Sequence, residues 1–189
     1  MRSIFTFLIT SLVLASCAED QNESIIITEP TIEPWSSVLD EQIKLLGHRN
    51  WIVVVDEAYP LQSSPGIITI LSDKDHLETI THVLNIIQKQ HHIAPTVYLD
   101  KEIDFVEESS AAGITAFRNE LHNLTGVLTS YKMLHEDIIA TLDKASQQFS
   151  VLIIKTDFTI PYTSVFFELG CKYWNAELEE ELRNRMPDS

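Results

Sequence analysis

The sequence of 189 residues predicts a layered α/β domain built on a largely buried mixed sheet. Segments with helical periodicity alternate along the chain with short apolar runs of strand length. The run at 51–55 is continuously apolar, and 149–154 is apolar except for Ser150, which is typical of strands covered on both faces. Once an N-terminal export segment is set aside, about 155 residues remain, the usual size of one domain.

In the first half of this domain the pattern predicts two helices and two strands. The first helix spans 36–46, with Ser36 or Ser37 as its cap and Gly47 as its stop signal. Apolar strands follow at 51–55 and 66–71. A second helix then extends from a cap at Asp73 to about Gln90, because Leu77, Ile80, Val83, Leu84 and Ile87 recur at helical spacing.

The second half continues the alternation. We expect a strand at 96–99, a helix at 109–121, a strand at 127–131, a helix at 135–146, strands at 149–154 and 165–169, and a polar helix at 175–185. In this last helix, Glu179 with Arg183 and Glu181 with Arg185 stand four positions apart and can pair along one face. These pairs favour a solvated helix over a partner site.

The N-terminus has the pattern of a bacterial export signal. Arg2 precedes an apolar run from Ile4 to Leu14, too short to cross a bilayer. The run ends in Leu-Ala-Ser-Cys, which resembles a lipobox and predicts a signal peptide at 1–16, a lipidated Cys17 and a flexible tether at 17–34. We therefore expect a lipid anchor in the cell envelope, on the periplasmic side or the cell surface. An ordinary secretory signal with a chance cysteine is the alternative.

Charge and cysteine content exclude several classes of function. Without Arg2, 12 of the 13 basic side chains remain against 28 acidic ones, a net charge of −16. This balance argues against binding to nucleic acid. If Cys17 is modified, Cys171 has no partner for a disulfide. The histidines show no metal-ligand spacing, and no phosphate loop is present, so neither a metal nor a cofactor is expected.

Ionisable side chains stand at the boundaries of predicted elements, where α/β proteins place their chemistry. His48 follows the first helix, Asp56 follows the first strand, and His135 opens a later helix. Eight extended positions separate His48 from Asp56 by up to about 26 Å, so they fall at opposite ends of the strand. One pocket can contain both only if the chain bends sharply or neighbouring subunits contribute.

Three segments, taken in order, resemble the bacterial ribose pyranase and fucose mutarotase family. The first is LGHRNWIVVVDEAYP, from Leu46 to Pro60. The second runs from Tyr131 to Glu136, a strand followed by a His-Glu helix start. The third, Phe149 to Cys171, has that family's strand, turn, Pro-Tyr segment and final strand ending in glycine. The resemblance places a sugar-active domain at 35–174, followed by a polar helix and tail at 175–189.

The resemblance implies a role for individual residues. His48 stands at the position of the proton-transferring histidine. Sugar contacts fall on Asp56, His135, Tyr162, Thr163 and Ser164. The chain departs from the family where Ser164 replaces an asparagine, Ile139 a lysine, and Asp157 a glutamate, so the identity of the sugar stays open.

The implied reaction interconverts ring forms or anomers of a ribose- or fucose-like monosaccharide by proton transfer. Histidine suits it, because its unperturbed pKa lies near neutrality. The family also implies a ring-shaped homo-oligomer, such as a decamer, with sugar sites between protomers. A non-catalytic sugar-binding lipoprotein, or an envelope protein with a structural or interaction role on the same scaffold, is the alternative.

Overall fold

The computed structural model describes residues 34–187. The predicted signal peptide, Cys17 and the tether up to residue 33 lie outside the described residues. The helices are α1 (Trp35–Gln42), α2 (His76–Lys89), the short 3₁₀ helix η1 (Lys101–Phe105), α3 (Ile114–Thr125), α4 (His135–Ser146) and α5 (Ala176–Arg185). The strands are β1 (Trp51–Val55), β2 (Ile67–Leu71), β3 (Ile93–Asp100), β4 (Ser130–Met133), β5 (Val151–Lys155) and β6 (Val165–Cys171).

The six strands form one mixed sheet, as the sequence predicted, and their order is β2-β5-β1-β6-β3-β4. Strand β6 is antiparallel to both of its neighbours, β1 and β3, and the other adjacent strands are parallel. Five strands therefore end at the edge of the sheet where β6 begins. Side chains that follow β1, β3 and β4 are brought together there with those that precede β6.

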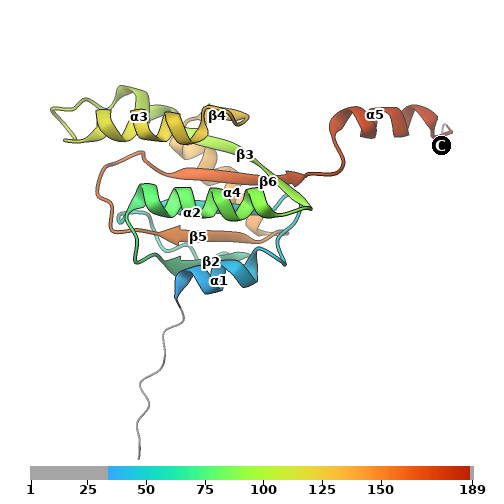
Figure 1. The fold of residues 1–189 in the computed structure, drawn as a ribbon, viewed down its shortest axis with the longest axis horizontal. Coiled ribbons are helices and arrows are strands. Elements are labelled where there is room, and N and C mark those ends of the chain that lie inside the picture. Colours follow the sequence, from blue (N-terminus) through green and yellow to red (C-terminus); the bar gives the residue numbers. More distant parts are fainter. Residues whose placement is uncertain (1–33, 188–189) are drawn as a thin grey trace, which may run out of the picture. The chain divides into compact units, whose positions relative to one another are not determined.

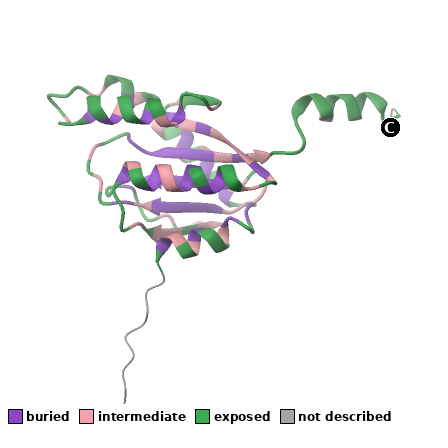
Figure 2. Ribbon diagram, in the orientation of Figure 1, coloured by how far each residue is buried: buried purple, intermediate pink, exposed green. Residues whose placement is uncertain are grey.

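Helices cover both faces of the sheet (Figure 1). On one face, apolar side chains of α1, α2 and α3, such as Leu39, Ile80 and Phe117, share a core with Ile52 and Ile154. On the other face, α4 packs Ile138 and Leu142 against residues of β1, β5 and β6, including Trp51. The central strands are accordingly buried along their length (Figure 2), which explains their continuously apolar sequences.

The first helix differs from its prediction at both ends. It begins at Trp35 after Pro34, and neither Ser36 nor Ser37 caps it. Its last regular residue is Gln42, so Gly47 is not the residue that stops it. The left-handed residue of the following turn is Arg49, at a φ of 73°, rather than the glycine.

The cap of α2 is Asp75, which corrects the prediction of Asp73. The amide of Glu78 donates to the Asp75 carboxylate at 2.8 Å, the usual N-cap bond. Asp73 instead accepts a hydrogen bond from the indole of Trp35 at 2.7 Å. Asp73 therefore ties the start of α2 to α1.

Further along the chain the boundaries shift by several residues. Strand β3 is longer than expected, β4 starts three residues late, and η1 was not predicted at all. Helix α3 begins at Ile114 rather than Ser109, because the Glu108 carboxylate accepts from the amides of Gly113 and Thr115 and holds a turn in front of the helix. These bonds lower the pKa of Glu108 to about 2.

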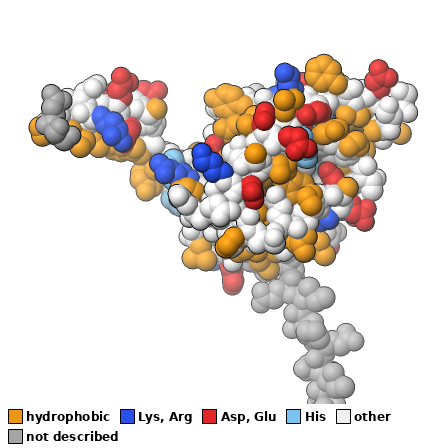
Figure 3. Space-filling model, turned by 180° about the vertical axis from the view of Figure 1, so that it is seen from behind, with side chains coloured by type: hydrophobic (Ala, Val, Ile, Leu, Met, Phe, Trp, Pro, Cys, Tyr) orange, Lys and Arg blue, Asp and Glu red, His pale blue; other side chains and the backbone are white. Residues whose placement is uncertain are grey.

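Helix α5 is polar and none of its residues is buried. The two predicted ion pairs are present, Arg183 with Glu179 at 2.6 Å and Arg185 with Glu181 at 3.4 Å. No helix within 34–187 is both long and apolar enough to span a membrane. Figure 3 shows acidic side chains scattered over one face of the molecule, in keeping with the net negative charge.

Candidate functional site

A cavity of about 210 Å³ opens at the edge of the sheet where β1 ends. Three of the residues singled out from the sequence, Asp56, His135 and Tyr162, line it together. The other lining residues are Ala58, Tyr59, Pro60, Thr159 and Pro161. Segments that are far apart in the sequence thus meet in one place.

Asp56 and Tyr59 are positioned by a tight turn after β1. The amide of Ala58 donates to the Asp56 carboxylate at 2.9 Å, which fixes the side chain at the mouth of the turn. Tyr59 is buried, and its hydroxyl donates to Gln62 at 3.4 Å. Burial, with the nearby Asp100 and Asp56 carboxylates, raises the pKa of Tyr59 well above its usual value, so its hydroxyl stays protonated.

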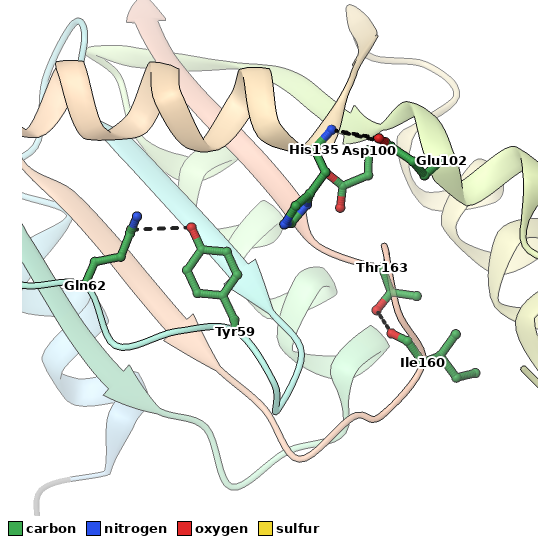
Figure 4. Close-up of polar contacts among 7 residues, drawn as sticks. All are labelled: Tyr59, Gln62, Asp100, Glu102, His135, Ile160 and Thr163. Atoms are coloured by element: carbon green, nitrogen blue, oxygen red, sulfur yellow. Dashed lines mark hydrogen bonds and ion pairs between the residues drawn. The ribbon is translucent and has the colours of Figure 1, made fainter.

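His135 is the first residue of α4, and two carboxylates fix it. Glu102 accepts from its backbone amide at 3.1 and 3.2 Å and so caps the helix from η1. The ring nitrogen Nδ1 lies 3.1 Å from Oδ1 of Asp100, the last residue of β3. Figure 4 shows the imidazole of His135 at the start of α4, beside the Asp100 carboxylate.

The contact between Asp100 and His135 determines which ring nitrogen carries the hydrogen. An ionised carboxylate only accepts, so Nδ1 of His135 carries the hydrogen and Nε2 has a free lone pair. Asp100 is wholly buried, and burial raises its pKa to about 6, although His135 counteracts the rise. The carboxylate thereby fixes the orientation of the His135 ring.

Tyr162 lies in a strained turn ahead of β6. Its φ of 58° is in the left-handed region, which costs a non-glycine residue about 1–3 kcal/mol. Its ring meets that of His135 edge to face, with centroids 5.7 Å apart. Tyr162 is 37% exposed, so it belongs to the cavity wall and not to the core.

Thr163 and Ser164 are buried and do not line the cavity. The hydroxyl of Thr163 donates to the carbonyl of Ile160 at 2.7 Å, which closes the turn around Tyr162. Leu99 pairs with Val165 across β3 and β6. Asp100, the last residue of β3, and Ser164, the residue before β6, follow this pair at the same end of the sheet. The Oδ2 of Asp100 and the Oγ of Ser164 are both buried without a protein partner in the described part of the chain.

His48 is at the opposite edge of the sheet, as the separation along β1 predicted. It lines a second cavity of about 520 Å³ with Arg49, Trp51 and Phe149 among others, and this cavity shares no residue with the first. The Nε of Arg49 donates to Nε2 of His48 at 3.3 Å. The Arg49 guanidinium lies 5.7 Å from the centroid of the Phe149 ring.

Sequence reasoning missed Asp100, Glu102 and Tyr59. An aspartate directly after a predicted strand was the available signal at Asp100, the same signal that drew attention to Asp56. Of the departures noted in the sequence, Ile139 packs into the core beneath α4 and Asp157 is exposed; neither lines the cavity around Asp56. The described residues contain no group of three side chains able to hold a metal ion.

Residues 35–172 match the model of the RbsD / FucU transport protein family, and the chain belongs to that family. No curated protein matches the sequence. Among solved structures, RbsD of Bacillus subtilis complexed with D-ribose is 20% identical, with a TM-score of 0.52 over 71% of this chain and 92% of that one. The fucose mutarotase of Streptococcus pneumoniae in complex with L-fucose is 19% identical, with a TM-score of 0.48 over 69% and 89%. At 20% identity, the likeness to RbsD concerns the fold.

Proposed function

We propose that this protein binds a ribose- or fucose-like monosaccharide and interconverts its ring forms or anomers. The observation that carries the proposal is the convergence of Asp56, His135 and Tyr162 in one cavity. Membership of the RbsD / FucU family and the fold of a relative complexed with D-ribose support it.

The cavity suits a small polyol. Its volume is below the roughly 300 Å³ at which pockets for drug-sized ligands begin. Carboxylate, imidazole and phenol groups surround it and can accept from or donate to several hydroxyls at once.

The reaction needs one base and one acid. Nε2 of His135 removes the proton from the anomeric hydroxyl, the bond between the anomeric carbon and the ring oxygen breaks, and an acid protonates that oxygen to give the open-chain aldehyde. Reclosure from another hydroxyl, or on the other face of the carbonyl, returns both protons. A positioned acid or base typically contributes 10²–10⁴-fold. Neither oxidation nor reduction takes place.

We assign the acid to His48 of a neighbouring copy. His48 and Asp56 are at opposite ends of β1, so one chain does not bring them together. In a ring-shaped homo-oligomer, the His48 edge of one protomer can face the Asp56 edge of the next. Sedimentation of the purified protein as a monomer at micromolar concentration would contradict this assembly.

The proposed location is the bacterial cell envelope, with a lipid on Cys17. Metabolic labelling with a fatty-acid analogue tests it. The wild-type chain should take up the label and fractionate with membranes, whereas Cys17→Ala should do neither. A wild-type chain without label would rule out the anchor.

Exchange NMR on the full chain tests the function itself, in a detergent without a sugar headgroup. A panel of pentoses and hexoses is screened for faster exchange between ring forms, with wild type, His48→Ala and His135→Ala. Acceleration by wild type that falls by about 10²-fold or more in both variants supports the proposal. Wild-type protein that accelerates no sugar refutes it.

A non-catalytic sugar receptor is the second candidate, and the position of His48 favours it. The cavity around Asp56 contains one histidine, enough to hold a sugar but one group short of the acid and base. Saturation-transfer NMR separates the two functions. Sugar binding that His135→Ala weakens, without acceleration of exchange by wild type, would identify a receptor.

A further inference from the structure

His76, the first residue of α2, is a buried polar side chain with no part in the proposed reaction. It is 1% exposed and is absent from the wall of the Asp56 cavity. Both of its ring nitrogens are nevertheless engaged. Nδ1 lies 2.7 Å from the hydroxyl oxygen of Thr156, and Nε2 lies 2.9 Å from the carbonyl oxygen of Thr163.

The two partners define the state of the imidazole. A carbonyl oxygen only accepts, so Nε2 carries a hydrogen and donates it to Thr163. In the neutral ring, Nδ1 accepts the single hydrogen of the Thr156 hydroxyl at 2.7 Å, and that hydroxyl then does not donate to the Val55 carbonyl, which lies 3.1 Å away. Burial lowers the pKa of His76, in keeping with a neutral ring. Both hydrogen bonds are therefore satisfied without a charge in the interior.

The imidazole also joins the two ends of the segment that leads from β5 to β6. Thr156 follows β5, and Thr163 stands two residues before β6. Between them, Phe158 stacks on the imidazole, with centroids 5.0 Å apart and planes 11° apart. The imidazole also packs against the ring of Phe117 in α3, with centroids 5.6 Å apart.

This segment carries Tyr162 in its strained conformation. A left-handed tyrosine persists only where its surroundings over-determine the backbone. The bond within the turn, from the Thr163 hydroxyl to the Ile160 carbonyl (Figure 4), is local and moves with the turn. The bond from His76 to the Thr163 carbonyl comes from α2, so it fixes the residue next to Tyr162 relative to the rest of the domain.

We propose that His76 is a positioning residue, which sets Tyr162 in the sugar cavity through its hydrogen bond to the Thr163 carbonyl. The role rests on the proposed function only for its effect on the sugar. Its effect on the segment 160–164 is independent of any ligand.

Two variants separate positioning from simple packing. His76→Leu fills the space but donates nothing, whereas His76→Gln places an amide N–H toward the Thr163 carbonyl. Thr156→Val is the control on the other nitrogen. It removes the hydroxyl that faces Nδ1, together with the contacts of that hydroxyl to the Val55 carbonyl and the Phe158 amide, and leaves the bond to Thr163. Rates and sugar affinity are measured on the full chain by exchange NMR. The conformation and mobility of the backbone are followed by the amide signals and the hydrogen exchange of residues 160–164.

We expect His76→Leu to raise KM about tenfold, to leave kcat within about threefold because Asp100 and His135 are untouched, and to speed amide exchange at Tyr162 and Thr163. His76→Gln should restore KM to within about threefold of wild type, and Thr156→Val should not shift it further than that. Equal changes of KM in His76→Leu and Thr156→Val, or no rescue by His76→Gln, would reduce His76 to a core residue.

The backbone measurement keeps the two proposals apart. If wild-type protein acts on no sugar, the proposed function fails, but the amide signals still decide the role of His76. Unchanged exchange at Tyr162 and Thr163 in His76→Leu would overturn the positioning role.

Discussion

Nδ1 of His135 lies 3.1 Å from Oδ1 of Asp100, a carboxylate with no exposed surface. An Asp-His pair of this kind fixes both the orientation and the tautomer of the imidazole. It also keeps an acidic group in the interior, where the charged form is destabilised. The pair therefore fixes the His135 ring at a cost to the stability of the folded protein.

Replacing Asp100 by Asn should raise stability at neutral pH. The folded-state pKa is about 6 against an ordinary 3.8, so between these values the folded protein binds more protons than the unfolded chain, and stability falls as pH rises. The shift corresponds to a loss of at most about 3 kcal/mol in the free energy of unfolding, and the loss is complete above about pH 6. Urea unfolding from about pH 4 to about pH 8 should show a gain for Asp100→Asn that grows through this window. Asp157→Asn, at an exposed side chain, is the matched control. If the free energies of unfolding of wild type and Asp100→Asn differ by the same amount at every pH, burial of the Asp100 carboxylate does not lower stability.

The same variant should lose activity while it gains stability. An amide can hold His135 in the wrong tautomer, because its N–H₂ group donates to Nδ1 where the carboxylate accepts from it. We expect kcat to fall about tenfold to a hundredfold with the sugar affinity little changed. Exchange NMR at saturating sugar measures this loss. Full activity in Asp100→Asn would show that His135 needs no orienting carboxylate.

His76 should give the opposite dependence on pH. Its folded-state pKa is lowered, chiefly by burial and in spite of the Asp56 and Asp75 carboxylates. The unfolded chain therefore takes up a proton first as pH falls below about 6.5, and the stability that neutral His76 contributes is lost. The difference in unfolding free energy between wild type and His76→Gln should be constant above neutrality and shrink toward about pH 5. His122→Gln, on the exposed face of α3, is the matched control. A difference that is constant throughout would mean that His76 does not titrate differently on folding.

Much of the fold followed from the apolar pattern of the chain. Strand β1 and helix α4 have the predicted bounds, because continuous burial and helical spacing are local signals. The helix caps did not follow as well: Asp73 and Asp75 are equally eligible, and the choice depends on Trp35, 38 residues away, which engages Asp73.

The candidate site was predictable only in part, for a similar reason. Asp56, His135 and Tyr162 stand at element boundaries or in a recognisable segment, and the structure brings them together. Asp100 and His76 act through contacts across the sheet or between α2 and the start of β6, and no pattern within one segment predicts such contacts. The separation of His48 from Asp56 could be predicted, because it depends only on the length of one strand.

The two glycines that flank β1 and β2 should respond differently to substitution. A Cβ at Gly66 would lie 2.3 Å from the carbonyl oxygen of Ser146 and 2.4 Å from that of Phe149, both backbone atoms. Gly66→Ala should therefore destabilise the protein by about 1–3 kcal/mol. Gly47 has nothing within 4 Å of the added carbon and no positive φ, so Gly47→Ala should stay within about 0.5 kcal/mol of wild type. Thermal unfolding of the two variants makes the comparison, and a larger loss at Gly47 would show that the Gly-His turn needs its glycine.

Mixed assemblies test whether neighbouring subunits share the sugar site. His48→Ala and His135→Ala each disable every site in a pure assembly. If one site takes His48 from one protomer and His135 from the next, random mixing of equal amounts restores both groups in about one quarter of the sites. The two chains are co-expressed with different tags, and assemblies that contain both are isolated and assayed by exchange NMR. A mixture of Asp56→Ala with His135→Ala is the matched control. Asp56 and His135 line the same cavity of one chain, so every cavity in this mixture still lacks one of the two residues. Recovery in the first mixture and not in the second would establish the shared site. Isolated mixed assemblies of His48→Ala and His135→Ala without activity would mean that His48 and His135 must come from the same chain, and an active pure His48→Ala assembly would mean that His48 has no part in the reaction.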